Sequence, residues 1–219
     1  MAHQTTAAVF VHGLWLNGVE FTPMRRRLAA SHGLQGHRFS YRSVGASIDE
    51  IVSRLSDFVA RIEADRIHFV AHSLGGVVLC RYFERASNVP HGRVVFLGSP
   101  TLGSQTAKNV GRVAMLAPLL GRTVADELIN PASARTWRGD RELGCIAGTR
   151  PMGLGRLFSR FKEESDGTVA VSETKLPGHT AHLTLPVSHT GMLLSPVVAA
   201  QVGEFLVNGR FKMGSGPIL

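Results

Sequence analysis

The sequence predicts an α/β fold in which a mostly parallel sheet of about six strands carries helices on both faces. Short apolar runs alternate with segments whose apolar residues recur at helical spacing, a pattern typical of parallel sheets covered by helices. The chain has 219 residues, enough to bury a substantial core in one domain. Its 44% hydrophobic and 18% charged residues are typical of a globular protein. We expect one domain over residues 1–208.

Six runs have the length and composition of buried strands. Most are rich in β-branched or aromatic residues, which pack well on a pleated surface. The runs cover residues 7–11, 37–41, 67–71, 93–97, 143–147 and 182–187.

Two helices are expected between the first three strands. The first covers residues 23–30, with Thr22 as N-cap, Pro23 at the first helical position and Gly33 at the end. The second begins with a capping box formed by Ser47 and Glu50. Apolar residues at helical spacing then predict the face that packs on the sheet: Ile51, Val52, Leu55, Phe58, Val59 and Ile62.

Two further helices are expected at residues 74–86 and 196–207. Two segments interrupt the alternation. Residues 104–138 are too long for a plain connection and carry an apolar patch at 115–120, which favours a cap or lid insertion. Residues 153–164 form an apolar and basic loop. We expect residues 209–219 to be a flexible tail.

The formal net charge is +8, largely from arginine. Such a charge favours phosphate-bearing surfaces such as anionic lipid or nucleic acid. The arginines are scattered except for Arg25, Arg26 and Arg27, so we expect no nucleic-acid binding. A basic soluble surface is the preferred interpretation, and peripheral contact with an anionic membrane is the second.

The first residues show no basic start followed by a long apolar run. We therefore expect neither a signal peptide nor a membrane span, and a cytoplasmic protein, with export by a signal-less route left open. Cys80 and Cys145 fall in a predicted helix and a predicted strand, where we expect buried reduced thiols.

The strongest local motif is Ala-His-Ser-Leu-Gly-Gly at residues 71–76, where a predicted strand ends and a predicted helix begins. A serine on such a tight turn projects its hydroxyl above the sheet edge, at the positive end of the following helix. Gly75 and Gly76 permit the close approaches that this turn needs. Ser73 is therefore the candidate nucleophile.

A serine hydroxyl needs a base within hydrogen-bond reach, and a third group must orient that base. With a strand-to-helix turn of this type, the chain order is serine, acid, histidine. His189 is the best-placed base because it follows the last predicted strand, whereas His179 precedes that strand and His182 lies inside it or at its start. His72 should point away from Ser73, since successive strand residues face opposite sides.

Asp166 is the candidate acid, because it stands in a turn-forming loop after the strand at 143–147. Asp140 precedes that strand and would lie at the opposite edge of the sheet. Asp126 lies in the long insertion. Glu163 and Glu164 remain the nearest rivals.

Acyl transfer also requires donors for the negative oxygen of the tetrahedral intermediate. One is the backbone N–H of Leu74, directly after the nucleophile at the helix start. The other should come from the loop after the first strand, and we assign it to Leu14, which follows His12 and Gly13.

Together these residues resemble the lipase and esterase branch of the α/β-hydrolases. The motifs span nearly the whole chain: His12-Gly13, residues 71–76, Gly-Ser-Pro-Thr-Leu-Gly-Ser at 98–104, Ser165-Asp166-Gly167 and Ser188-His189. Ala71 stands where the usual turn has glycine, and Thr101 where the branch often has histidine.

The resemblance implies that Ser73 attacks an ester carbonyl with His189 as base, while Asp166 orients His189. The alcohol leaves, and water then frees the acid from the acyl-enzyme. The resemblance also implies that neither a metal ion nor an organic cofactor takes part, and that the partner is a small-molecule or lipid ester.

Apolar side chains around the predicted site would suit an acyl group. The candidate substrate-binding residues are Trp15, Met115, Leu119, Leu157, Phe158 and Met192. For Met192, core packing is the stronger alternative. In residues 153–164, apolar side chains alternate with arginine and lysine, which predicts a contact of the site's mouth with anionic lipid.

Three functions fit these residues. They are a carboxylic ester hydrolase of lipase type, an acyltransferase or thioesterase on the same site, and a catalytically silent hydrolase fold used for binding. The silent fold is disfavoured because no triad member is missing from the sequence. Whether water or another acceptor meets the acyl-enzyme is not decided by these residues.

Overall fold

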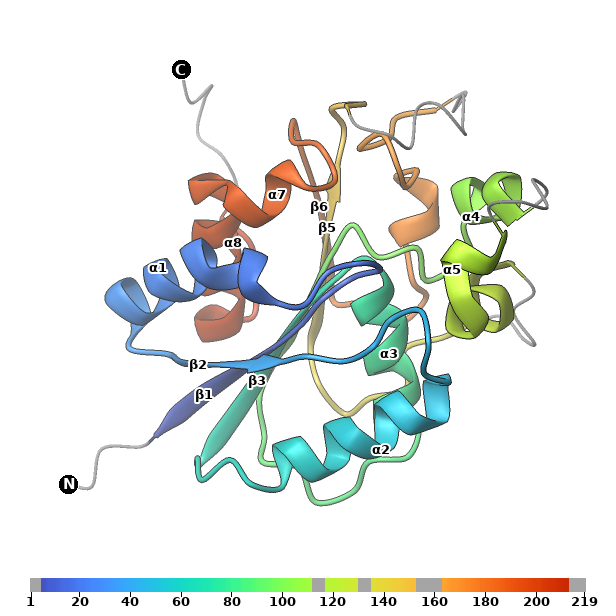
Figure 1. The fold of residues 1–219 in the computed structure, drawn as a ribbon. Coiled ribbons are helices and arrows are strands. Elements are labelled where there is room, and N and C mark those ends of the chain that lie inside the picture. The colour runs from blue at the N-terminus through green and yellow to red at the C-terminus, as the bar shows by residue number, and fades with distance from the viewer. Residues whose placement is uncertain (1–4, 112–116, 130–134, 153–162, 213–219) are drawn as a thin grey trace.

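The computed structural model describes residues 5–111, 117–129, 135–152 and 163–212. These residues include a sheet of six parallel strands in the order β2-β1-β3-β4-β5-β6 (Figure 1). The strands are β1 (Thr6–Val11), β2 (Gln35–Phe39), β3 (Arg66–His72), β4 (Val94–Leu97), β5 (Leu143–Gly148) and β6 (Ala181–Leu185). The predicted α/β class with a six-stranded parallel sheet is confirmed.

Helices cover both faces of this sheet because the strand side chains alternate between the faces. On β1, Val9 packs in a cluster with α2 and α3, whereas Phe10 packs in a second cluster with α1, α7 and α8. Figure 1 shows α2 and α3 on one side of the sheet and α1, α7 and α8 on the other. The helices are α1 (Thr22–His32), α2 (Ile48–Val59), α3 (Leu74–Phe83), α7 (Gly191–Leu194) and α8 (Pro196–Asn208). The core therefore consists of two apolar layers, one on each face.

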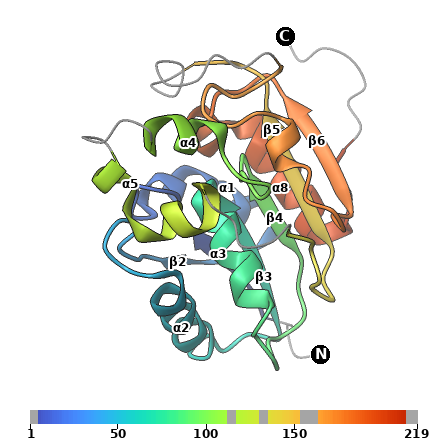
Figure 2. The same cartoon turned by 90° about the vertical axis from the view of Figure 1, so that its right-hand side faces the viewer.

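The expected insertion at residues 104–138 contains three helical segments that the sequence did not predict. They are α4 (Gln105–Gly111), α5 (Ala117–Val124) and the short π-helical turn η2 (Ala125–Ile129). Figure 2 shows α4 and α5 beside α3. An apolar cluster joins the insertion to α3 and to the loop after β1: Leu74, Val77, Ala107, Val110, Leu120, Val124 and Leu128, with Leu14 packed against them.

Element boundaries differ from the sequence predictions for local reasons. β2 ends at Phe39, and the N–H of Tyr41 is donated to His12 Nε2 at 3.1 Å instead of to a strand. β6 ends at Leu185, because Pro186 has no N–H to continue the pairing. The N-cap prediction for Thr22 is wrong: this residue lies inside α1, and its hydroxyl donates to the Val19 carbonyl at 2.6 Å.

The predicted end of α1, the predicted capping box of α2 and the predicted state of the cysteines are confirmed. Ser47 and Glu50 form the capping box of α2, and Gly33 ends α1 with a positive φ of 65°. Cys80 and Cys145 are buried free thiols. No helix within the described ranges is both long enough and apolar enough to cross a membrane. Two short helical turns, η1 (Val19–Phe21) and η3 (Ser172–Thr174), complete the described elements.

Candidate active site

Four loops meet at the carboxyl end of the parallel sheet. Ser73 follows β3, Gly98 follows β4, the loop with Asp166 follows β5, and the loop with His189 follows β6. Since β3, β4, β5 and β6 are consecutive neighbours, these loops leave the same edge. In open α/β sheets this is the edge at which ligands bind.

Ser73 occupies a strained turn between β3 and α3. Its backbone has φ 52° and ψ −121°, a conformation that residues with a side chain rarely adopt. Two glycines make the turn possible: a Cβ at Gly75 would lie 2.3 Å from the carbonyl oxygen of Val11, and one at Gly76 would lie 2.3 Å from Ser99 Oγ. The strand-to-helix turn that the motif predicts is therefore present, with the partly buried serine at its tip.

The Asp166 carboxylate is almost completely buried and fully engaged. Its Oδ1 accepts the N–H groups of Thr168 at 2.9 Å and Val169 at 2.7 Å, and its Oδ2 lies 2.7 Å from Nδ1 of His189. An ionised carboxylate can only accept hydrogen bonds, so opposite it Nδ1 of His189 carries the proton and donates it. Nε2 is then the basic nitrogen, as a general base requires.

The rival candidates lie in other surroundings. His182 is in β6 with Nε2 2.9 Å from the Thr174 hydroxyl, and His179 Nδ1 lies 2.6 Å from the Leu176 carbonyl. Glu163 and Glu164 are both exposed. The structure thus brings Asp166 and His189 together and leaves these rivals elsewhere.

The proximity of Ser73 to His189 follows from contacts of neighbouring residues. Among the hydrogen bonds of the described residues, none joins the Ser73 hydroxyl to His189. Neighbouring contacts place the two close: the ring of His72 packs on the ring of His189 with centroids 4.5 Å apart, and a Cβ at Gly98 would lie 3.2 Å from His189 Nδ1. Catalytic hydrogen bonds are often long before the substrate binds.

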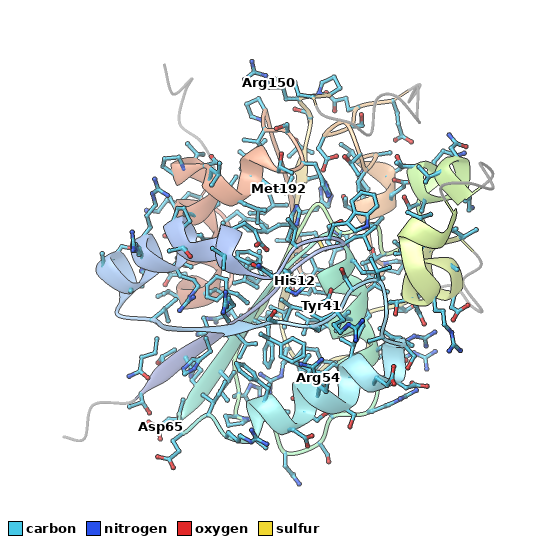
Figure 3. The ribbon with its side chains drawn as sticks, in the orientation of Figure 1. His12, Tyr41, Arg54, Asp65, Arg150 and Met192 are labelled. Atoms are coloured by element: carbon cyan, nitrogen blue, oxygen red, sulfur yellow. The ribbon has the colours of Figure 1, made fainter. Side chains whose placement is uncertain are left out.

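The loop after β1 passes directly beside Ser73, since a Cβ at Gly13 would lie 3.0 Å from Ser73 Cβ. His12 holds this loop. Its Nδ1–H donates to the Gly13 carbonyl at 2.8 Å, its Nε2 accepts the Tyr41 N–H, and the Tyr41 hydroxyl donates to the His12 carbonyl at 2.7 Å. The rings of His12 and Tyr41 stack with centroids 4.1 Å apart, and Figure 3 labels both residues. Burial lowers the pKa of His12, which keeps the ring neutral in this arrangement.

Leu14 follows Gly13 in the sequence and Leu74 follows Ser73, so each is next to a residue of this contact. The N–H of Leu74 belongs to the first turn of α3, where backbone donors have no partner within the helix. The side chains of both leucines pack in the apolar cluster of the insertion. An oxyanion hole at Ser73 would need two such backbone donors.

Comparison with known proteins agrees with this architecture. The model of the alpha/beta hydrolase family matches residues 8–203. The chain belongs to the alpha/beta hydrolase family. No curated protein matches the sequence significantly.

Solved structures of this hydrolase fold resemble the chain at low sequence identity. A lipase of Bacillus licheniformis, BlEst2 in its propeptide form, has a TM-score of 0.77 at 17% identity, over 97% of this chain and 52% of the lipase. The Legionella pneumophila phospholipase PlaB in complex with thio-NAD has 0.62 at 18%, over 78% and 44%. The metagenomic carboxyl esterase MGS0156 has 0.62 at 16%, over 86% and 66%. The chain thus spans about half the length of the first two.

The apolar residues expected to bind substrate fall into three groups. Trp15, in the loop after β1, is 62% exposed. Met192 is completely buried with its terminal methyl next to Gly98 and Gly148, so in this structure it packs in the core. Met115, Leu157, Phe158 and the side chain of Leu119 lie outside the described residues.

No group of three or more metal-ligating side chains that could hold an ion occurs in the described part of the chain. Sequence reasoning also missed two histidines. In the sequence, His12 only marks the loop after the first strand, and His72 is expected only to point away from Ser73. The contacts of His12 with Tyr41 and of His72 with His189 join residues far apart along the chain, and no local sequence pattern indicates them.

Proposed function

We propose that this member of the alpha/beta hydrolase family is a serine hydrolase that cleaves carboxylic esters with apolar acyl groups. The observation that carries the proposal is the buried hydrogen bond between Asp166 and His189 at 2.7 Å, at the sheet edge that presents Ser73 on a strained turn. An aspartate, a histidine and a serine arranged in this way form the acyl-transfer machinery of many unrelated hydrolases.

The reaction proceeds in two steps. Ser73 Oγ attacks the ester carbonyl carbon while His189 Nε2 takes its proton, and Asp166 stabilises the resulting imidazolium. The N–H groups of Leu14 and Leu74 bind the tetrahedral oxyanion. The alcohol leaves with the proton from His189. Water then attacks the acyl-enzyme with His189 as base, which releases the acid and restores Ser73.

An apolar acyl group suits the surroundings of Ser73. The leucines that supply the oxyanion donors are part of the apolar cluster over the start of α3, and the exposed ring of Trp15 lies on the same loop as Leu14. The similar structures include proteins called a lipase, a carboxyl esterase and a phospholipase, which supports an ester substrate. A lipid ester is therefore the proposed substrate class.

Contact with an anionic membrane is a second part of the proposal. It rests on the net charge of +8 and on the apolar and basic sequence of residues 153–164. Replacing Phe158 and Phe161 with serine should weaken binding to vesicles of anionic lipid. Unchanged vesicle binding would remove this part without affecting the chemistry at Ser73.

Aryl esters from acetate to laurate test the activity. The wild-type protein should hydrolyse them with a preference for longer chains, and Ser73→Ala should lower kcat/KM by about 10⁴-fold or more. Equal rates for the two proteins would refute the proposal. A new ester formed in the presence of an alcohol would indicate an acyltransferase, and absence of any turnover would favour a binding module.

A further inference from the structure

His72 precedes Ser73 in the sequence and contacts His189. It is the last residue of β3 and only 1% exposed. Its Nε2 lies 3.0 Å from the main-chain carbonyl oxygen of His189, and the two rings are tilted by 46° with centroids 4.5 Å apart. The two residues are 117 positions apart in the sequence.

The partners of His72 define its protonation. A carbonyl oxygen can only accept a hydrogen bond, so Nε2 carries the proton and donates it. Nδ1 is buried without a hydrogen-bond partner among the described residues, close to the backbone of Gly13. Burial holds the pKa of His72 well below its ordinary value, and the neighbouring His189 adds to the lowering. His72 is therefore a neutral donor in a single tautomer.

Among the described residues, three hydrogen bonds hold His189, and they come from two different parts of the fold. Its N–H donates to the Asp166 carbonyl at 3.0 Å and its Nδ1–H to the Asp166 carboxylate, so both of these ties lead to the loop after β5. The bond from His72 leads to β3, the strand that carries Ser73. Among the hydrogen bonds of the described residues, it is the one that joins His189 to that strand.

We propose that His72 is a positioning residue that fixes the separation between Ser73 and His189 by holding the His189 carbonyl on β3. This inference rests on the proposed function of Ser73 and His189. His72 acts through the backbone of His189, not through contact with the substrate. Without the hydrogen bond from His72, the remaining hydrogen bonds of His189 among the described residues all lead to Asp166. A displacement of about 1 Å between reacting groups lowers rates by about 100-fold.

Two isosteric amides separate the hydrogen bond from the bulk of the side chain. In His72→Gln the side-chain NH₂ reaches approximately the position of Nε2 and can donate to the His189 carbonyl, whereas in His72→Asn it ends near the position of Nδ1. We expect His72→Asn to lower kcat by about 100-fold with KM changed by less than about threefold, because ground-state binding is untouched. His72→Gln should recover most of kcat.

His68 supplies a matched control on the same strand. It is buried, and its Nδ1 accepts the N–H of Arg93 at 2.8 Å, which the amide oxygen of His68→Asn can replace. This variant should keep the wild-type kcat. The inference is overturned if His72→Asn keeps the wild-type kcat, or if the Gln and Asn variants lose kcat equally and in proportion to their loss of unfolding free energy.

A nuclear magnetic resonance readout keeps the inference separate from the proposed function. In the wild-type protein, His72 should remain in the neutral Nε2–H form at pH values where an exposed histidine is already protonated. The Nδ1 proton of His189 should be sharp in wild type and His72→Gln and broadened in His72→Asn. If the wild type hydrolyses no ester, the proposed function fails while this spectrum still tests the bond. An Nδ1–H tautomer of His72, or an identical His189 signal in all variants, would overturn it.

Discussion

His189 is tied to Asp166 twice. Its ring Nδ1 lies 2.7 Å from the Asp166 Oδ2, and its main-chain N–H donates to the Asp166 carbonyl oxygen at 3.0 Å. The remaining carboxylate oxygen of Asp166 accepts two further backbone N–H groups. The orientation of the imidazole therefore depends on a carboxylate that is itself held in place by the backbone of its own loop.

Asp166→Asn tests this orientation. The amide would favour the wrong tautomer of His189, with the proton on Nε2, so kcat should fall by about 10⁴-fold while the fold is retained. Steady-state kinetics with an aryl ester and circular dichroism measure the two effects. Glu164→Gln is the control, because Glu164 is exposed and should leave kcat unchanged. If Glu164→Gln were the damaging variant, Asp166 would not be the acid.

Gly75→Ala tests the close packing of the turn at Ser73 against β1. The added Cβ would lie 2.3 Å from the Val11 carbonyl oxygen, and a backbone atom cannot give way without moving β1. We expect a loss of about 4 kcal/mol or more in unfolding free energy. Gly33→Ala is the matched control, since its φ is 65° but no atom lies within 4 Å of the new methyl, and it should cost about 1 kcal/mol. Equal losses in urea unfolding would contradict the proposed contact.

Glu127→Gln tests how the insertion is attached. The Glu127 side chain is 5% exposed and lies between Arg81, whose Nε is 3.1 Å away, and the buried Arg135. Removing the charge leaves a buried guanidinium without its counterion, which should cost about 3 to 5 kcal/mol in urea unfolding. Glu84→Gln breaks the more exposed pair with Arg81 and should change stability by less than about 1 kcal/mol. A small effect at Glu127 would show that the insertion is held by apolar packing alone.

Buried histidines should make stability fall in acid. Burial lowers the pKa of His68 and of His182 from 6.5 to about 4, so between these values the unfolded chain binds protons that the folded chain does not. Their contribution is fully present above pH 6.5 and is lost as the pH falls towards 4, by about 3 kcal/mol for His68. The raised pKa of Glu173 acts in the opposite direction.

Urea unfolding over this pH range measures the acid effect. In His68→Asn the dependence of the unfolding free energy on pH should become shallower by about one proton. A dependence that stays as steep as in the wild type would show that His68 is not buried in its neutral form.

The elements that the sequence predicts well have their signals in local residues. Ser47 and Glu50 mark the start of α2, and the motif at residues 71–76 marks the strand-to-helix turn at Ser73, because a capping box and a tight turn involve neighbouring residues only. The sequence predicts Asp166 and His189 because each follows a late predicted strand and because the chain order serine, acid, histidine goes with such a turn. Loops that leave the carboxyl ends of parallel strands share one edge of the sheet.

Other features depend on partners distant in the sequence. Tyr41 lies beyond the end of β2 and is hydrogen-bonded to His12. The helices of the insertion are stabilised by packing on α3 and by Glu127, which lies between two arginines. The contact of His72 with His189 arises only when β3 and the loop after β6 come together. The spacing of apolar residues along the chain does not indicate such contacts.

The central claim is that Ser73 is a nucleophile activated by His189. A fluorophosphonate probe, followed by mass spectrometry of the intact protein and of its peptides, tests it most directly. We predict one adduct per chain, located on Ser73, and labelling slowed by orders of magnitude in a folded His189→Ala variant. An unlabelled Ser73 in folded wild-type protein, or equal labelling rates with and without the imidazole of His189, would contradict the claim.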